Sequence, residues 1–150
     1  MSLPPNYTLA RLKNSDHLDA LSVLSQLTTV GEVSIDQFKQ FVNIQLPDNS
    51  NDAGYYTYVI RENDKLVAIA TLLVEIKLIH GFSKVGHIED VAVDSNQRGR
   101  GLGKILIEHL ISQGLEKGCY KIILDCDVKN VGFYEKCGMK NAGIEMETRG

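Results

Sequence analysis

The sequence predicts an α/β protein in which a mixed β-sheet is flanked by helices. Three observations support this fold class. Two helical patterns precede residue 47, runs of β-branched and aromatic residues follow residue 54, and strand and helix patterns then alternate to the C-terminus. A chain of 150 residues has the usual size of one domain. We therefore expect residues 1–150 to form a single domain.

Two helices are predicted in the N-terminal third. The first is capped by Ser15, and its apolar residues recur at every third position: Leu18, Leu21, Leu24 and Leu27. The second covers residues 35–44, where Ser34 and Gln37 form a capping box. Both helices are expected to pack on the sheet.

The rest of the chain predicts a hairpin followed by a βαβαβ order. Residues 55–62 and 66–79 form the hairpin around a polar turn. The elements that follow are a strand over 85–93, a helix over 102–118, a strand over 119–126, a short helix over 130–138 that ends at Gly138, and a last strand over 142–149. The long helix has one apolar face, made of Leu102, Ile105, Leu106, Leu110, Ile111 and Leu115.

The composition excludes several classes of protein. With 43% hydrophobic and 23% charged residues, the chain is neither disordered nor collagen-like. Its net charge of -3 gives no general attraction to nucleic acid or anionic lipid, so we expect neither as a partner. No apolar run suits a transmembrane helix or a secretion signal, and we expect a cytoplasmic protein.

Cysteine and histidine spacing predicts neither a disulfide framework nor a metal site. Cys119, Cys126 and Cys137 are an odd number of cysteines without a CxxC pair. The four histidines lack the HExxH spacing of zinc enzymes. We expect reduced thiols and no bound metal.

A glycine-rich segment, residues 97–104, joins the strand over 85–93 to the long helix. It contains three alternate glycines, Gly99, Gly101 and Gly103, and three cations, Arg98, Arg100 and Lys104. Glycines let main-chain N–H groups approach a ligand closely, and a helix N-terminus favours anions, so a pyrophosphate suits this segment. A Rossmann fingerprint would need glycine in place of Lys104, and a Walker A loop would need glycine in place of Arg98. A turn with solvated charges remains the alternative.

The spacing RxxGxG, from Arg98 to Gly103, resembles the acetyl-CoA pyrophosphate loop of the GCN5-related N-acetyltransferases (GNAT). The resemblance implies the GNAT acyl-CoA N-acyltransferase fold, in which the strand over 85–93 carries a bulge. That strand would splay from the one over 119–126, so that the pantetheine arm of acetyl-CoA lies between them. The implied cosubstrate-binding residues are Val91, Ala92, Val93, Arg98, Gly99, Arg100, Gly101, Leu102, Gly103, Lys104, Tyr134 and Lys136.

Further strings, among them LTTVG, KLIH, VGHIEDVAV and NVGFYEKCGM, are similar to one branch of that superfamily. Its members are small homodimers with shared active sites that acetylate glucosamine 6-phosphate for UDP-N-acetylglucosamine synthesis. The implied substrate-binding residues are Thr28, Lys77, His80, Glu89, Asp90, Lys121, Asp125 and Arg149. The resemblance also implies that the strand over 142–149 pairs across the two-fold axis, where Arg149 could serve the partner's phosphate site.

Several of these residues have plainer interpretations. Glu89 and Asp90 interrupt an apolar strand, and the residues alone leave an exposed edge and a bulge toward a cleft equally open. Lys77 and His80, taken alone, would be surface residues, and Thr28 a turn hydroxyl. The resemblance favours the functional interpretation in each case.

The implied chemistry is direct attack of the amine on acetyl-CoA in a ternary complex. Asp125 and nearby carbonyl groups would orient the amine and accept its proton, main-chain N–H groups of residues 91–93 would steady the thioester oxygen, and Tyr134 would protonate the leaving thiolate. Cys126 invites a covalent acetyl-enzyme, but a free cysteine in an apolar strand is usually core, and no histidine is near it in sequence. The alternatives are acetylation of a protein lysine or N-terminus, and a non-catalytic acetyl-CoA-binding module.

Overall fold

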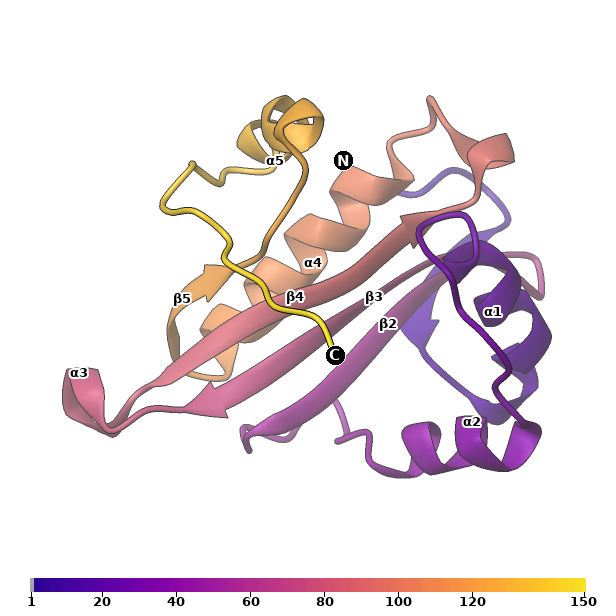
Figure 1. The fold of residues 1–150 in the computed structure, drawn as a ribbon. Helices are drawn as coiled ribbons and strands as arrows, with labels where there is room; N and C mark the ends of the chain where they lie inside the picture. The colour runs from indigo at the N-terminus through magenta and orange to yellow at the C-terminus, as the bar shows by residue number, and fades with distance from the viewer. Residues whose placement is uncertain (1) are drawn as a thin grey trace.

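A mixed five-stranded sheet forms the centre of the molecule, which we describe from a computed structural model that covers residues 2–150. The strands are β1 (Tyr7–Arg11), β2 (Gly54–Glu62), β3 (Lys65–Ile76), β4 (Lys84–Val93) and β5 (Cys119–Ile123). They lie side by side in chain order, antiparallel from β1 to β4, and β5 runs parallel to β4 (Figure 1). The predicted α/β class and the predicted hairpin, here β2 and β3, are confirmed.

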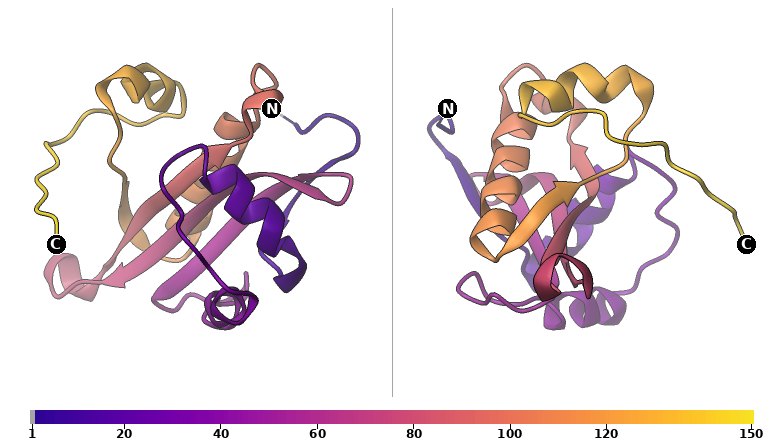
Figure 2. Two further views of the ribbon diagram at one scale, coloured as in Figure 1. Left: turned by 45° about the vertical axis from the view of Figure 1, so that its right-hand side comes forward. Right: turned by 90° about the vertical axis from the view of Figure 1, so that its left-hand side faces the viewer.

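Helices cover both faces of the sheet. They are α1 (His17–Leu24), α2 (Ile35–Asn43), α3 (Ile79–Phe82), α4 (Leu102–Glu116) and α5 (Val131–Lys136), with single 3-10 turns η1 (Asn14–Asp16), η2 (Ser95–Gln97) and η3 (Val128–Asn130). α1 and α2 lie on one face, and α4 lies on the other (Figures 1 and 2). No helix among the described residues is both long and apolar enough to cross a bilayer.

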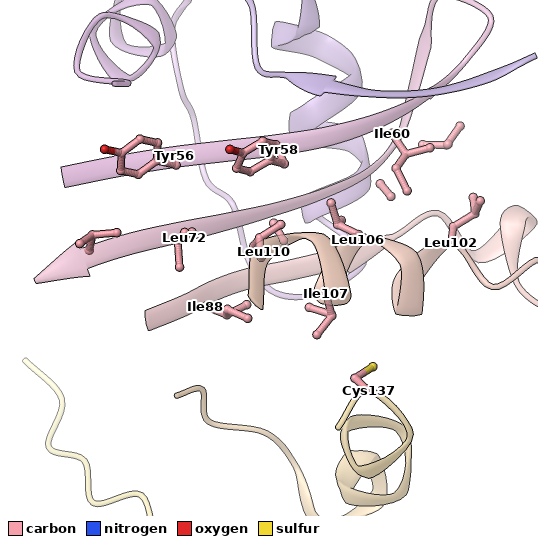
Figure 3. Close-up of a cluster of buried hydrophobic side chains, with 14 of the residues drawn as sticks. Tyr56, Tyr58, Ile60, Leu72, Ile88, Leu102, Leu106, Ile107, Leu110 and Cys137 are labelled. Carbon is pink, nitrogen blue, oxygen red and sulfur yellow. The ribbon is translucent and has the colours of Figure 1, made fainter. Parts of the chain in front are cut away.

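Two apolar cores result, because successive residues of a strand point to opposite faces. Tyr58 and Ile60 of β2 pack with Leu106 and Leu110 of α4 (Figure 3), whereas Val59 packs with α1 and α2. The predicted apolar face of α4 is correct in part. Leu102, Leu106 and Leu110 are buried, Ile105 and Ile111 are partly buried, and Leu115 is 55% exposed. Ile107 and Gly114 are also buried, which the pattern did not predict.

The first predicted helix begins later and faces differently than expected. Ser15 lies within η1 and caps nothing, and α1 begins at His17. Leu18 is 76% exposed, while Ala20 and Val23 face the core. A spacing of three falls short of the 3.6-residue turn, so residues repeated every third position drift around the helix and cannot share one face. The capping box between Ser34 and Gln37 of α2 is confirmed.

Strand β1 was not predicted. The segment that follows it is held to β2 by a buried ion pair between Asp16 and Arg61. Arg61 on β2 donates from Nε to Oδ1 of Asp16, at 3.0 Å, and from Nη2 to Oδ2, at 2.5 Å. Asp16 also accepts a hydrogen bond from the main-chain N–H of Lys13. Asp16 and Arg61 are only 2% and 6% exposed, so water hardly reaches either charge. Each charge is instead neutralised by the other.

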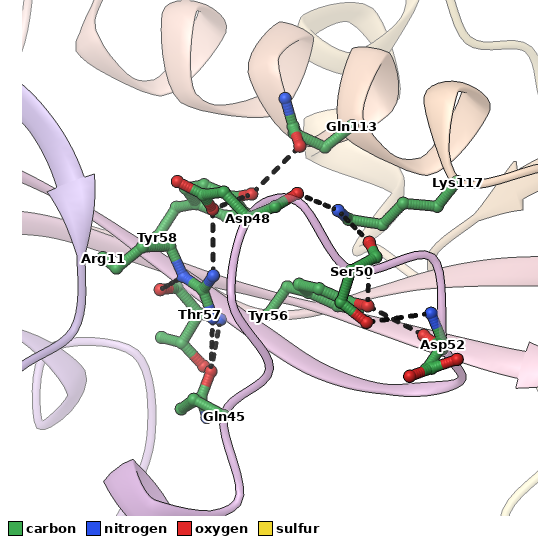
Figure 4. Close-up of polar contacts among 10 residues, drawn as sticks. All are labelled: Arg11, Gln45, Asp48, Ser50, Asp52, Tyr56, Thr57, Tyr58, Gln113 and Lys117. Carbon is green, nitrogen blue, oxygen red and sulfur yellow. Dashed lines mark hydrogen bonds and ion pairs between the residues drawn. The ribbon is translucent and has the colours of Figure 1, made fainter.

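The loop between α2 and β2 is fastened to the end of α4 by polar contacts (Figure 4). The buried ammonium of Lys117 donates to the carbonyl groups of Asp48 and Ser50, each at 2.8 Å, and lies 4.2 Å from the ring centroid of Tyr56. Burial lowers the pKa of Lys117, although the Asp48 carboxylate opposes that effect. Tyr58 donates to Asp48 at 2.8 Å.

The predicted last strand, residues 142–149, is absent from the structure. Ile144 and Met146 are 90% and 88% exposed, and the end of the chain leaves the body of the molecule (Figure 2). A strand needs a hydrogen-bonding neighbour, and this segment pairs with neither edge of the sheet, β1 or β5. We call residues 139–150 the tail.

Candidate active site

Strands β4 and β5 separate halfway along their length and open a cleft. They pair only from Lys84 to His87 of β4, and the last pair joins His87 to Ile123. Beyond it, β4 forms one wall and residues 124–127 form the other wall of a cleft of about 1170 Å³. This volume exceeds the range of about 300–1,000 Å³ that is typical of small-ligand pockets, so the cleft suits a long ligand. The predicted splay of these strands is confirmed.

A β-bulge turns two acidic residues of β4 toward the cleft. Glu89 pairs with Thr71 and Ala92 pairs with Ile69, so Asp90 and Val91 together oppose a single residue of β3. Asp90 has a φ of 51°, a left-handed conformation that an ordinary strand residue avoids. Glu89 and Asp90 are both exposed and both line the cleft. Of the two alternatives left open by the sequence, the structure therefore supports a bulge toward a cleft and not an exposed strand edge.

The cluster of carboxylates affects the charge of Glu89. Partial burial raises the pKa of its carboxyl group, and the carboxylates of Asp90, Asp125 and Glu145 raise it further, against the influence of His87. Negative charge thus gathers where the two cleft walls meet the tail. This mouth attracts a cationic group such as a protonated amine.

The glycine-rich loop closes one end of the cleft. Gly99 and Gly101 have φ values of 83° and 74°, and Gly101 immediately precedes α4. Residues of the loop, including Arg98, and Lys104 in the first turn of α4 line the cleft. Main-chain N–H groups, two cationic side chains and a helix N-terminus therefore meet at one point, an arrangement that binds phosphate groups.

Asp125 and Tyr134 lie on the opposite wall. Both line the cleft, and the Tyr134 ring packs against the core beneath α4. Burial raises the pKa of the Tyr134 hydroxyl, and the neighbouring thiols of Cys126 and Cys137 add to the shift. Tyr134 therefore keeps its proton at neutral pH and can donate it.

Cys126 is exposed and lines the cleft, so the expectation of a core cysteine was wrong. The reason is that β5 ends at Ile123, three residues earlier than its apolar pattern suggests. No histidine among residues 2–150 lines the cleft, so Cys126 has no imidazole there to activate it.

The structure brings most of the remaining expected cosubstrate residues to the cleft, but not all. Val91, Val93, Gly103 and Leu102 line it. Ala92 instead points into the core under α1 and α2, since it alternates with its neighbours along β4. Lys136, at the end of α5, is exposed and does not line the cleft.

Arg100 is also placed outside the cleft. Its guanidinium donates to the Tyr7 hydroxyl at 2.6 Å and to Oε1 of Gln97 at 2.8 Å. These contacts turn it toward β1, away from the cleft-lining side of the loop. Gly99 lies between Arg98 and Arg100 with a left-handed φ of 83°, so the backbone turns there and the two side chains face different ways.

The expected substrate residues divide into two groups. Arg149 lines the cleft together with Glu89, Asp90 and Asp125. Thr28 is exposed beyond α1 and does not itself line the cleft, although its neighbour Leu27 does.

The second group lies at the far end of the sheet, around α3. The Lys77 ammonium is 3.6 Å from Oε1 of Glu75, and His80 stacks on the ring of Tyr120 with centroids 4.0 Å apart. Lys121 lies over the same ring, 5.7 Å from its centroid. Within one chain these three residues do not join the cleft.

Sequence reasoning missed several residues that line the cleft. They are Gln26, Leu27, Gln97, Leu124, Asp127, Lys129, Asn130, Phe133 and Glu145. Gln26 and Leu27 follow α1, and no local pattern connects them to the loop. Lys129 and Asn130 had a usable signal, because they lie between the end of β5 and the helix of Tyr134.

Replacing Gly101 by valine should raise the KM for acetyl-CoA about tenfold, the effect of losing one charge-assisted contact. A β-branched residue does not adopt the left-handed φ of 74°, so the main chain must move at the point where its N–H groups face the cleft. Steady-state kinetics at varied acetyl-CoA would measure the change.

Gly118→Val is the matched control for backbone strain. Gly118 also has a left-handed φ, 92°, and nothing lies within 4 Å of a Cβ atom there. It follows α4 at the end away from the loop, so this variant should lose comparable stability and keep the wild-type KM. If Gly101→Val and Gly118→Val had the same KM for acetyl-CoA, the loop would not hold the cosubstrate.

Comparisons with known proteins agree with this geometry. Residues 20–139 match the Acetyltransferase (GNAT) family. Glucosamine 6-phosphate N-acetyltransferase of Candida albicans is 45% identical, with 99% of each chain covered, and that of Arabidopsis thaliana is 40% identical, with 93% of this chain and 94% of the relative covered. The crystal structure of the Arabidopsis thaliana enzyme superposes with a TM-score of 0.86 at 39% identity, covering 95% of this chain and 97% of that one.

A Trypanosoma brucei acetyltransferase superposes with a TM-score of 0.83 at 36% identity, covering 95% of this chain and 99% of that one. Both similarities extend over almost the whole chain. The chain therefore belongs to the acetyltransferase (GNAT) family and, within it, to the family of glucosamine 6-phosphate N-acetyltransferases.

Proposed function

We propose that this protein transfers the acetyl group of acetyl-CoA to the 2-amino group of D-glucosamine 6-phosphate. The products are N-acetyl-D-glucosamine 6-phosphate, a precursor of UDP-N-acetylglucosamine, and CoA. One observation carries the proposal: a single cleft gathers the glycine-rich loop, the β4 bulge and Tyr134 in a chain that aligns end to end with enzymes of this name. We assign the activity to one domain, residues 1–150.

The cleft fits acetyl-CoA. Arg98, Lys104 and the loop N–H groups would hold the pyrophosphate, and the space between the splayed strands would take the pantetheine arm. Past His87, the main-chain groups of β4 that point away from β3 have no strand neighbour among the described residues. N–H groups of residues 91–93 are thus available to steady the thioester oxygen as it gains charge.

The acidic mouth suits the amino group of the acceptor. Glu89 and Asp90 would bind sugar hydroxyls and draw in the ammonium form, which must lose a proton before it attacks. Asp125, with neighbouring carbonyl groups, would orient the neutral amine and accept the proton that its nitrogen loses as the amide forms. Arg149 would meet the phosphate of the sugar, a dianion that a protein with net charge -3 must attract locally.

Tyr134 completes the transfer as general acid. The free amine attacks the thioester carbon, the carbon–sulfur bond breaks, and the Tyr134 hydroxyl supplies the proton to the thiolate. The reference pKa values are about 10 for tyrosine and about 8.5 for a thiol, so the transfer from Tyr134 is uphill and depends on a hydrogen bond between the hydroxyl and the sulfur. The absence of a histidine beside Cys126 among residues 2–150 favours direct transfer over an acetyl-cysteine route.

An acceptor comparison tests the function. CoA release should be fast with glucosamine 6-phosphate, slow with a histone-type peptide, and slow without an acceptor. Turnover with the peptide alone would instead indicate a protein acetyltransferase, and acetyl-CoA binding without any turnover would indicate a non-catalytic module. Intersecting lines in a two-substrate analysis would support the ternary complex.

We also propose a cytoplasmic homodimer with shared active sites. Free thiols at Cys119, Cys126 and Cys137 suit a reducing compartment. The dimer would bury the apolar residues that a single chain exposes on the tail, Ile144 and Met146. Their alternation with Glu145 and Glu147 suits a strand, which would pair across a two-fold axis and remove an exposed edge.

The dimer would also give a role to the basic residues around α3. Lys77, His80 and Lys121 lie outside the cleft of their own chain. Leu78 and Phe82, in the same segment as Lys77 and His80, are exposed. If Leu78 and Phe82 lie in the dimer interface, then Lys77, His80, Lys121 and Arg149 would serve the phosphate site at the boundary between subunits.

Replacing both Ile144 and Met146 by aspartate should convert the dimer into a monomer and remove most of the activity. Two buried carboxylates without partners oppose association strongly. Sedimentation velocity and the CoA-release assay would follow both effects. Leu115→Asp is the control: Leu115 is exposed on α4 and not on the tail, so this variant should remain dimeric. A wild-type protein that is monomeric and fully active would refute the dimer.

A further inference from the structure

A cluster of four polar side chains lies behind the glycine-rich loop, and of these four residues Gln97 also lines the cleft. Tyr7 comes from β1, Glu62 from the end of β2, Gln97 from η2 and Arg100 from the loop itself. Segments 90 residues apart in the chain therefore meet at this point. We call these four residues the clasp.

The contacts within the clasp are short and interconnected. Arg100 donates to Tyr7 and Gln97, Gln97 donates from Nε2 to Glu62 at 3.0 Å, and the Tyr7 hydroxyl lies 2.9 Å from Glu62. The guanidinium is 3.9 Å from Oε2 of Glu62, so its charge has a counter-ion. The hydrogen bonds from Tyr7 and then Gln97 lower the pKa of Glu62, which keeps it ionised.

The clasp fixes the loop between two glycines. Gly99 and Gly101, the residues on either side of Arg100, have left-handed conformations that cost little only in glycine. Such a segment has many alternative conformations in isolation, and the Arg100 contacts select one of them. That conformation turns Arg98 and the loop main chain to the cleft.

The start of the same segment is held independently. Gln26, after α1, accepts from the main-chain N–H of Ser95 at 2.8 Å and donates to Asp94 at 3.3 Å. Asp94 also bonds through its N–H to the carbonyl of Val67 in β3. Because this end is already fixed, the clasp determines how residues 98–101 face the cleft.

We propose that the clasp is a positioning device for acetyl-CoA binding, in which Glu62 and Tyr7 act through Arg100 without touching the cosubstrate. Arg100 thus orders the loop, and Arg98 is the arginine that pairs with the pyrophosphate. A preformed loop avoids the cost of ordering when the ligand binds. The inference rests on acetyl-CoA as the ligand of the proposed function and not on the identity of the acceptor.

Glu62→Gln gives the decisive test, because the two possible roles of Arg100 predict opposite signs. If Arg100 met the phosphates directly, removal of the competing Glu62 carboxylate would tighten CoA binding or leave it unchanged. If Arg100 orders the loop, Glu62→Gln should weaken CoA binding about fivefold, within the range of residues that act through a network. Calorimetric titration of the full-length protein with CoA measures this without any acceptor.

Kinetics and a second substitution test the same point. Tyr7→Phe removes one hydroxyl, should weaken CoA binding to a similar degree, and should add little to Glu62→Gln in the double variant. Both variants should raise the KM for acetyl-CoA and keep kcat, which a general loss of stability would not do. Tyr56→Phe is the control, because it deletes a hydroxyl that bonds the other loop at Ser50 and Asp52.

Unchanged or tighter CoA binding in Glu62→Gln would overturn the proposal, as would fully additive effects of the two substitutions. A wild-type protein that binds no CoA would overturn the clasp and the proposed function together. A wild-type protein that binds CoA but does not acetylate glucosamine 6-phosphate would overturn only the acceptor.

Discussion

Asp16→Ala should lower the free energy of unfolding by about 3–5 kcal/mol, the usual loss when one partner of a buried ion pair is removed. The substitution leaves the Arg61 guanidinium buried, with the main-chain carbonyl of Arg11 as its remaining acceptor. It also frees the N–H of Lys13. Urea denaturation followed by circular dichroism would measure the loss as a lower midpoint with an unchanged slope.

Two further variants identify the cause of that loss. Asp36→Ala removes an exposed carboxylate from the first turn of α2 and should cost less than about 1 kcal/mol. The double variant Asp16→Leu with Arg61→Met should recover much of the loss, since no charge is left unpaired. A loss below about 1 kcal/mol in Asp16→Ala would mean that water reaches Arg61 in that variant.

The region around the Asp16–Arg61 pair is the part of the fold that could not be predicted from the sequence. The runs of β-branched and aromatic residues in β2 and β3 and the apolar pattern of α4 are local signals, and all three elements form close to the predicted bounds. Strand β1 is only five residues long, and its pairing partner is β2, which begins 43 positions after the strand ends. A short strand defined by a distant partner leaves no local pattern to detect.

The candidate site shows the same division. The loop glycines were predictable because a left-handed conformation can be inferred from residue type and spacing, and the bulge was one of two open alternatives. The direction of Arg100 was not predictable, because Tyr7 and Glu62 meet it only in the folded chain. The tail reads as a strand since its apolar residues alternate, but a strand forms only where a neighbour supplies hydrogen bonds.

Tyr134→Phe should reduce the turnover rate by roughly 10²-fold or more, the usual effect of losing a general acid, while the affinity for acetyl-CoA stays nearly constant. The ring remains to fill its place against the core, so the variant should fold. Stopped-flow detection of free CoA would give the rate, and calorimetry the affinity. Tyr55→Phe is the matched control, because Tyr55 lies against Phe41 outside the cleft.

The acetyl donor then distinguishes proton transfer from packing. A donor whose thiol is more acidic needs less protonation as it leaves, so the defect of Tyr134→Phe should shrink with such a donor if the hydroxyl supplies the proton. The raised pKa of Tyr134 keeps the hydroxyl protonated at neutral pH, so the wild-type rate should not require a basic medium. Equal defects with both donors would mean that Tyr134 only packs against the cosubstrate and that water protonates the sulfur. In that case the burial of the tyrosine, and not its acidity, would explain its place in the cleft.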